Sequence, residues 1–412
     1  MKVSILTLGC RVNQAESSFI EGNLINNGIS IVNLNDNPDY CIINTCSVTS
    51  KSDYQSRQLI RRALKIGSKV IVTGCYTYLN SESISKINKE IIVVPNDKKY
   101  NIINLINNNN EIKYLSYSSN SRPYIIIQDG CNNKCSYCIV RIVRGKSRSI
   151  PIEKIIEQVK NYTDSGYNEI VLTGIHIGSY GYDLEPKVKL SHLINIILKK
   201  TNIMRIRLSS LEVTEIEDEL LEMMNDERIC NHLHIPIQSG DDRILRLMNR
   251  NYNTRFYSLK IEKIAKKVNN INIGTDIIVG FPGETEKEFD NTKNLILNLP
   301  ISYIHIFPFS AREGTPAYNY NDQINNGEKK KRCLELQSIN KIKKKNYYEK
   351  QLGKELNIII EKKISEKLYT GTSENFLKIS VISNDLPLKS CIKSKILQNE
   401  KNNLIGIPIN KI

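Results

Sequence analysis

The chain has 412 residues, of which 40% are hydrophobic and 25% are charged, and its net charge is +15. This length is too great for one hydrophobic core, so two or three domains are expected, and the composition excludes a disordered chain. No apolar run approaches the roughly 18 residues of a membrane helix, and no signal peptide is recognisable. We therefore expect a cytoplasmic protein without membrane contact, in which ten cysteines indicate metal or redox chemistry and not disulfides.

The positive charge is concentrated in the last fifth of the sequence. Residues 329–412 contain 19 Lys and Arg against 8 Asp and Glu, a net charge of +11, which leaves only +4 for the preceding residues. A basic tail on a nearly neutral body favours a polyanionic partner, above all RNA. The abundance of Lys, Asn and Ile throughout the chain is the alternative, purely compositional explanation.

Residues 1–115 alternate strand-like and helical segments. This alternation predicts an open parallel sheet with helices on both faces. The expected strands are 2–10, 39–46, 69–75 and 90–96, and the expected helices are 14–27 and 52–67. The polar residues 108–122 are interpreted as a linker.

A second alternation within residues 120–350 predicts a partial (β/α)6 barrel, whose site should lie at the carboxyl ends of its strands. A basic helix over 326–350 leads out of it. The expected strands are 124–128, 169–174, 205–210, 232–237, 273–280 and 303–309, separated by helices over 152–162, 190–200, 215–224, 241–250 and 286–298.

The remaining residues, 351–412, contain four short β-type runs separated by turns. These runs are 355–363, 368–373, 376–383 and 390–397. They predict a small antiparallel β-barrel, an architecture that often serves as a nucleic-acid module.

Three cysteines, Cys131, Cys135 and Cys138, follow the first expected barrel strand in the segment GCNNKCSYC. A structural zinc site takes four ligands, usually as two pairs, and no second pair is present here. Three thiolates instead suit a 4Fe–4S cube whose fourth iron stays open for an external ligand. A coincidental grouping or a degenerate zinc knuckle is the alternative.

Another three cysteines, Cys10, Cys46 and Cys75, each end an expected strand of the N-terminal sheet. Ligands of open α/β sheets bind at the carboxyl ends of the strands, so these thiols can converge on one crevice. The pattern predicts a second three-thiolate site, whereas isolated buried cysteines are usually inert. The four other cysteines are interpreted as packing or surface residues.

Together these motifs resemble the methylthiotransferases, radical S-adenosylmethionine (SAM) enzymes that insert sulfur and a methyl group into an unactivated C–H bond. The similar segments are TLGCRVNQAES, NTCSVT, VTGCY, GCNNKCSYCIVRIVRGKSRS, HLHIPIQSGDDRILRLMNRNY, DIIVGFPGET and FPFSAREGTPA. The resemblance implies an N-terminal domain with an auxiliary 4Fe–4S cluster (1–115), a radical SAM barrel (120–350) and a TRAM-like RNA-binding barrel (351–412). CRVNQAES is closest to the branch acting on N6-threonylcarbamoyladenosine at position 37, next to the tRNA anticodon.

The resemblance also implies roles for individual residues. Cys131, Cys135 and Cys138 would hold the catalytic cluster that binds and reduces SAM, and Cys10, Cys46 and Cys75 the cluster that carries the transferred sulfur. SAM contacts are expected from Tyr137, Thr173, Gly174, Ser209, Ser210, Gln238, Asp276 and Gly280, although a tight turn alone would explain Thr173 and Gly174. His176, His232, His234 and His305 are interpreted as satisfied polar residues inside the barrel.

The expected partners are the tRNA anticodon stem-loop and an electron donor such as a flavodoxin or ferredoxin. Phosphate contacts are expected from Arg144, Lys146 and Arg148 beside the cluster and from Lys343, Lys344 and Lys345 of the basic helix. Two alternative substrates are isopentenyladenosine in tRNA and an aspartate of a ribosomal protein. An alternative of another class is a non-catalytic RNA-binding iron–sulfur sensor or electron carrier.

Overall fold

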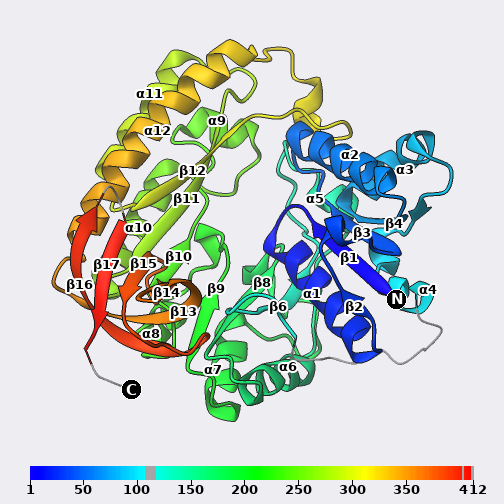
Figure 1. Ribbon diagram of the computed structural model, residues 1–412. Coiled ribbons are helices and arrows are strands. Elements are labelled where there is room, and N and C mark those ends of the chain that lie inside the picture. The colour runs from blue at the N-terminus through cyan, green and yellow to red at the C-terminus, as the bar shows by residue number, and fades with distance from the viewer. Residues whose placement is uncertain (107–116, 401–402, 410–412) are drawn as a thin grey trace.

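The computed structural model describes residues 1–106, 117–400 and 403–409, so part of the expected linker, 108–116, lies outside the described residues. Figure 1 shows a parallel sheet with its helices at the N-terminal end of the chain, a central array of strands and helices, and a small barrel at the C-terminal end. No helix in the described ranges is long and apolar enough to cross a membrane.

The N-terminal sheet has five parallel strands in the order β2-β1-β3-β4-β5. Its central strands are almost continuously apolar because both faces are covered. Ile42 and Ile71 pack under α1 and α4, whereas Ile43 and Val72 pack under α2 and α3 on the opposite face. The elements are β1 (Lys2–Thr7), α1 (Arg11–Asn26), β2 (Ser30–Ile31), β3 (Tyr40–Thr45), α2 (Ser50–Lys65), β4 (Lys69–Gly74), α3 (Cys75–Ile87), β5 (Ile92–Val93) and α4 (Asn101–Ile106).

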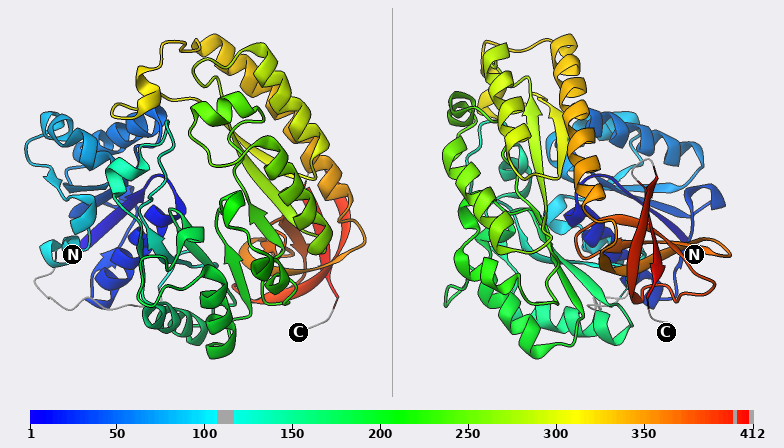
Figure 2. Two further views of the ribbon diagram at one scale, coloured as in Figure 1. Left: turned by 180° about the vertical axis from the view of Figure 1, so that it is seen from behind. Right: turned by 90° about the vertical axis from the view of Figure 1, so that its left-hand side faces the viewer.

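The central part contains six parallel strands that form an open barrel in two sheets, β6-β8-β9 and β10-β11-β12. A single bridge between Ile206 and Ile229 continues the array from β9 toward β10, and the short β7 pairs antiparallel with β6. Helices line the outside of the array (Figure 2). One apolar core of buried side chains joins these helices to all six strands. The strands are β6 (Tyr124–Asp129), β7 (Arg148–Ser149), β8 (Glu169–Gly174), β9 (Arg205–Leu208), β10 (His232–His234), β11 (Asn272–Val279) and β12 (Tyr303–Pro308).

Helices of the central part follow the expected order with two additions, α5 and α10, which the sequence pattern did not predict. The long α12 packs beside α11 and against β12 and leads to the C-terminal barrel (Figure 1). The helices are α5 (Val140–Arg144), α6 (Ile152–Asp164), α7 (Leu190–Lys200), α8 (Asp218–Met223), α9 (Asp242–Leu247), α10 (Thr254–Lys267), α11 (Glu286–Asn298) and α12 (Asn326–Glu349).

The C-terminal part is a closed barrel with the strand order β13-β14-β15-β17-β16. Its last strand, β17, was not expected, and it pairs in parallel with β15, so the barrel is antiparallel except at this pair. The strands are β13 (Glu355–Ser365), β14 (Leu368–Ser373), β15 (Lys378–Ile382), β16 (Cys391–Glu400) and β17 (Asn403–Pro408).

A buried charge cluster attaches this barrel to the central part. Arg205 and Arg207 of β9 both pair with Glu169 of β8, which is completely buried. Their remaining N–H groups donate to main-chain carbonyls of the C-terminal barrel, among them that of Thr372 at 3.1 Å and that of Ser373 at 2.8 Å. The C-terminal barrel is therefore held by hydrogen bonds from charged donors, which are stronger than those from neutral ones.

Candidate functional site

The loop that follows β6 carries Cys131, Cys135 and Cys138 at the mouth of the barrel. It starts at Gly130, whose positive φ of 72° and close approach to the Lys146 carbonyl, 2.0 Å from the position of a Cβ, admit only glycine. Ser136 anchors the middle of the loop, because its hydroxyl donates to the Leu247 carbonyl at 2.7 Å. The three thiols are thus presented by a fixed loop.

Two side chains from other barrel loops contact these thiols. Arg250 donates to the sulfur of Cys135 at 3.1 Å, and His176 lies 3.6 Å from the sulfur of Cys131 through its Nδ1. The other ring nitrogen of His176 lies 2.6 Å from Glu215, which fixes the ring. Neither contact was expected from the sequence, because nothing in the local pattern shows that Arg250 or His176 lies against the cysteine loop.

The second triad lies at the carboxyl edge of the N-terminal sheet, as predicted from the strand ends. Cys10 precedes α1, Cys46 follows β3, and Cys75 starts α3. Gly9 lets the first two approach, since a Cβ there would lie 2.7 Å from the Cβ and 2.9 Å from the sulfur of Cys46. Burial raises the pKa of the Cys75 thiol to about 11, while the nearby charge of Arg144 opposes this shift.

The two triads lie next to one another across the boundary between the N-terminal and central parts. Cys75 packs directly with Ile139, the residue after Cys138, and with Val143 of α5. A pocket of about 250 Å³ joins Val48 and Thr49, just after Cys46, to Cys138. Both three-thiol sites therefore border one region at the barrel mouth.

The chemistry of the donor sets fits iron–sulfur clusters better than single ions. Three thiolates around one zinc ion lie about 3.8 Å apart, given Zn–S distances of about 2.3 Å. Neither triad brings its three sulfurs within 4.8 Å of one another; among the described residues only His234, Asp276 and His305 bring three ligand atoms that close. In a 4Fe–4S cube each thiolate holds a separate iron, so the three sulfurs need not come that close.

Of the expected SAM contacts, the structure brings Tyr137, Gln238 and Asp276 into the pocket that Cys138 lines. Thr173 and Gly174 end β8, and Ser209 and Ser210 follow β9, at the same end of the barrel. The hydroxyl of Ser209 is buried and has no hydrogen-bond partner among the described residues. Gly280 does not line this pocket; it forms the turn after β11, where a Cβ would meet Lys329 of α12 at 2.4 Å.

The histidines behave largely as satisfied polar residues. His232 is buried and lies 2.7 Å from the hydroxyl of Tyr303. His234 contacts Asp276 at 3.0 Å, and His305 contacts the same oxygen at 3.1 Å. His305 is half exposed, but it pairs with Asp276 and its ring lies 5.1 Å from that of His234 and 5.2 Å from that of Tyr303, so it too is a partnered polar residue of the barrel.

The expected RNA contacts divide into two kinds. Lys146 and Arg148 are exposed beside the cysteine loop, Lys345 is exposed on α12, and Lys344 is partly exposed there. Lys343 instead donates to the carbonyls of Leu297 and Leu299 and so caps the end of α11. Its ammonium group is therefore already used within the protein.

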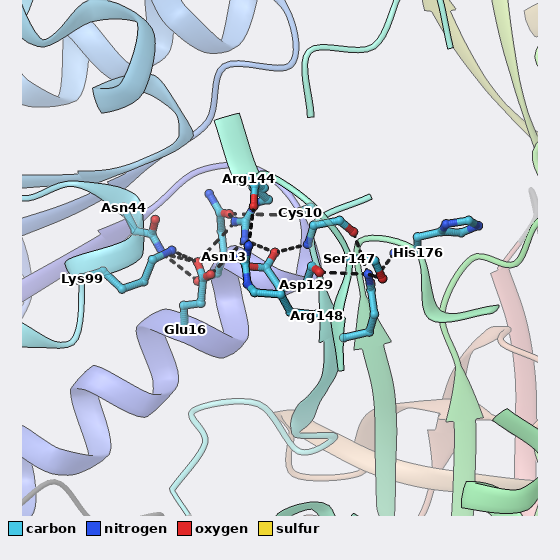
Figure 3. Close-up of polar contacts among 12 residues, drawn as sticks. Cys10, Asn13, Glu16, Asn44, Lys99, Asp129, Arg144, Ser147, Arg148 and His176 are labelled. Atoms are coloured by element: carbon cyan, nitrogen blue, oxygen red, sulfur yellow. Dashed lines mark hydrogen bonds and ion pairs between the residues drawn. The ribbon is translucent and has the colours of Figure 1, made fainter. Parts of the chain in front are cut away.

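Arg144 is a correction to the expected phosphate contacts. Its side chain is 0% exposed, because it pairs with Glu16 of α1 at 3.0 Å and with Asp129 of β6 at 2.9 Å. Figure 3 shows it between these residues and Asn13. A buried guanidinium held by two carboxylates cannot meet RNA, and it connects the N-terminal and central parts instead.

Two family models match the chain. Residues 125–296 match the Radical SAM superfamily, and residues 2–95 match the Uncharacterized protein family UPF0004. The first range contains the barrel triad, and the second contains Cys10, Cys46 and Cys75.

Two solved structures have a similar fold at low sequence identity. TsrM, a radical S-adenosylmethionine methyltransferase from Kitasatospora setae, has a TM-score of 0.57 at 10% identity, covering 77% of this chain and 76% of that one. The cobalamin-dependent S-adenosylmethionine radical enzyme OxsB has a TM-score of 0.53 at 11% identity, covering 81% of this chain and 56% of that one. At these identities the similarity establishes the fold alone.

Curated relatives are similar over nearly their whole length. The threonylcarbamoyladenosine tRNA methylthiotransferase MtaB of Aquifex aeolicus is 36% identical, covering 87% of this chain and 93% of the relative. The MtaB of Bacillus subtilis is 34% identical, covering 96% and 94%. A tRNA-2-methylthio-N(6)-dimethylallyladenosine synthase of Fervidobacterium nodosum is 30% identical, covering 97% and 96%. With its radical SAM barrel and its two cysteine triads, the chain belongs to the radical SAM tRNA methylthiotransferase family.

Proposed function

We propose that this enzyme methylthiolates C2 of N6-threonylcarbamoyladenosine at position 37, next to the tRNA anticodon. The observation that carries the proposal is the proximity of the two cysteine loops: Val48 and Thr49, just after Cys46, line the same pocket as Cys138, and Cys75 packs against Ile139. Two observations support this base over isopentenyladenosine. The relatives with 34–36% identity are named threonylcarbamoyladenosine tRNA methylthiotransferases, and the segment CRVNQAES resembles that branch.

Each triad is proposed to hold one 4Fe–4S cluster. Cys131, Cys135 and Cys138 would hold the cluster that binds SAM, and Cys10, Cys46 and Cys75 the auxiliary one. The clusters and SAM together would supply the one-electron chemistry and the sulfur that no side-chain acid or base can provide at an aromatic C–H bond. The buried Nε of Arg144, which has no partner among the described groups, leaves a donor near the auxiliary site.

The protein's own residues would bind the reactants and exclude water. Phe307, Pro308 and Phe309 form apolar walls of the pocket, and Gln238 and Asp276 offer hydrogen-bonding groups beside them. Polar groups set among apolar walls orient a ligand while the walls keep solvent away. The adenine base and SAM both combine a flat apolar face with polar edges, so this lining suits either.

The proposed partners are the tRNA anticodon stem-loop and an electron donor such as a flavodoxin or ferredoxin. Lys146 and Arg148 are exposed beside the barrel cysteine loop, and Lys344 and Lys345 lie on α12, which leads to the C-terminal barrel. Phosphate contacts from such residues position RNA without reading its sequence.

Nucleoside mass spectrometry of tRNA from a deletion strain tests the substrate. Loss of 2-methylthio-N6-threonylcarbamoyladenosine, with the unmodified base accumulating, is the expected result. Its persistence, or loss of the methylthio-isopentenyl nucleoside in its place, would contradict the proposal. Complementation with Cys75→Ala should fail, whereas Cys333→Ala, a half-buried thiol outside both triads, should restore the modification.

Iron analysis and SAM cleavage test the cofactors separately. The anaerobically reconstituted protein should contain about eight irons per chain, because each proposed cube holds four. About four irons would refute the second cluster. If both clusters form but no 5′-deoxyadenosine appears on reduction with SAM, a non-catalytic iron–sulfur protein becomes the better explanation.

A further inference from the structure

Two buried arginines of the central part reach across the boundary to the loops that carry the N-terminal triad. Arg144 stands at the end of α5, and Arg312 lies in the loop after β12. Arg144 is only 4% exposed and Arg312 only 8%. Both bind side chains adjacent to the cysteines, so each has the geometry of a positioning residue.

Arg144 acts through Asn13. Its Nη2 donates to the Asn13 side-chain oxygen at 2.5 Å, and the Asn13 amide in turn donates to the carbonyls of Leu8 and Thr45 at 2.8 and 2.9 Å. Those carbonyls lie just before Cys10 and Cys46 in the chain. One guanidinium thereby holds both loops through a single amide (Figure 3).

Arg144 is also tied to the barrel triad. Its Nη1 donates to Asp129 at 2.9 Å, and the same carboxylate oxygen accepts the Gly130 N–H at 2.8 Å, directly before Cys131. Glu16 completes the network at 3.0 Å from Arg144 and is shared with Lys99. The network thus connects Gly130, just before Cys131, with the carbonyls of Leu8 and Thr45, just before Cys10 and Cys46.

Arg312 holds the opposite side. Its Nη2 donates to the hydroxyl of Ser47 at 2.9 Å and to Asp53 of α2 at 2.7 Å. Ser47 follows Cys46 directly and donates to the same Asp53 carboxylate at 2.7 Å. The loop that carries Cys46 is therefore fixed from both sides by barrel arginines.

We propose that Arg144 and Arg312 are positioning residues that hold the N-terminal cysteine loops at a fixed place relative to the barrel triad and neutralise the carboxylates Glu16, Asp129 and Asp53 beside them. The inference rests on the proposed auxiliary cluster at Cys10, Cys46 and Cys75. Positive charge near a cluster stabilises its reduced, more negative state, and the potential of iron–sulfur clusters depends on such charges. Removing either arginine would leave the negative charge of its carboxylates uncompensated, so the two arginines keep the reduction potential higher than it would be without them.

The test separates charge from geometry with matched variants. Arg144→Gln and Arg312→Gln remove the charge, whereas Arg144→Lys and Arg312→Lys keep the charge but lose the planar fork. Arg141→Gln, on the exposed side of the same short helix, is the control. All are made in a background with Cys131, Cys135 and Cys138 replaced by alanine, so that only the N-terminal cluster can form.

Three readouts follow: iron per chain, the midpoint potential of the cluster by electron paramagnetic resonance, and hydrogen exchange of residues 8–16 and 45–53. The glutamine variants should shift the potential to more negative values and speed exchange in both segments, while Arg141→Gln changes neither. The lysine variants should keep the potential but show the faster exchange. In the otherwise unaltered chain, each glutamine variant should lower methylthio product by about 100-fold, the cost of a misplacement of about 1 Å, with SAM cleavage retained.

The proposal is overturned if both glutamine variants keep the potential and the exchange rates of the control. If Arg144→Gln fails to fold, the double variant Glu16→Gln/Arg144→Gln removes the carboxylate left with fewer partners and should show the same faster exchange; because it removes one charge of each sign, its potential should stay near that of the control. If no iron binds to this background at all, the proposed cluster fails, and exchange in the two segments still decides whether the arginines position the loops.

Discussion

Replacing Glu169 with glutamine is expected to loosen the attachment of the C-terminal barrel. The Glu169 carboxylate is fully buried and pairs with Arg205 and Arg207, whose other N–H groups donate to main-chain carbonyls of the C-terminal barrel. Nη1 of Arg122 lies 3.5 Å from the same carboxylate. Removing one member of a buried ion pair costs about 3–5 kcal/mol, because the partner charge is left unpaired. With more than one guanidinium affected, we expect the upper end of this range, a large share of the about 5–15 kcal/mol that stabilises a typical domain.

The pH dependence of this effect has a definite sign. Burial alone would raise the pKa of Glu169, but Arg205, Arg207 and Arg122 lower it well below its ordinary value of 4.5. A carboxyl group whose pKa is lowered by folding contributes its stability above its unfolded pKa and loses it as the pH falls through the folded value. The difference between wild type and Glu169→Gln should therefore be constant from about pH 6 upward and shrink on acidification.

Urea unfolding followed by far-ultraviolet circular dichroism measures the change, since the chain has no tryptophan to report by fluorescence. Hydrogen exchange of residues 369–381 locates it. Glu157→Gln, an exposed carboxylate on α6, is the matched control. A change in unfolding free energy within about 0.5 kcal/mol of this control, as for an ordinary surface substitution, would refute the assignment of Glu169 as the anchor of the C-terminal barrel.

Gly9→Ala should reduce the iron content by about half while leaving SAM cleavage intact. The reason is that the φ angle of Gly9 is 99° and the new methyl group would overlap the Cys46 side chain. An unchanged iron content would contradict the close approach of the loops that carry Cys10 and Cys46. Lys343→Ala should lower the free energy of unfolding by about 0.3–1 kcal/mol through loss of its contacts at the end of α11, with little change in tRNA affinity. Replacing Lys344 and Lys345 together by alanine should instead flatten the salt dependence of tRNA binding by a slope of about 1.4–1.8, and an unaltered slope would remove α12 from the RNA surface.

The sequence pattern predicted the elements whose signals are local. Cys10, Cys46 and Cys75 end strands rich in Val and Ile, and parallel strands must bring their carboxyl ends to one edge, so their convergence was predictable. β17 was missed because this short strand contains Gly406 and ends at Pro408, and both are poor strand formers. Its place is decided by the two strands that it joins and not by its own residues.

The errors about single residues have a different cause. Arg144 belongs to a run that resembles a phosphate-binding loop, but Glu16, which buries it, lies 128 positions away in the sequence. The site contacts of Arg250 likewise depend on a distant loop, since Cys135 is 115 positions away. Local patterns identify which residues carry chemistry, whereas burial and partners are settled only when separate parts of the chain pack together.

The closing strand of the C-terminal barrel has a consequence for synthesis on the ribosome. β17 pairs with β15 on one side and β16 on the other, so both keep an open edge until the final segment emerges. Up to that moment the unfinished module exposes backbone groups that invite pairing with other chains. A chain in which β17 has not yet been made is thus prone to aggregation, and deleting Asn403–Pro408 should yield insoluble product even though all six cysteines of the two triads are retained.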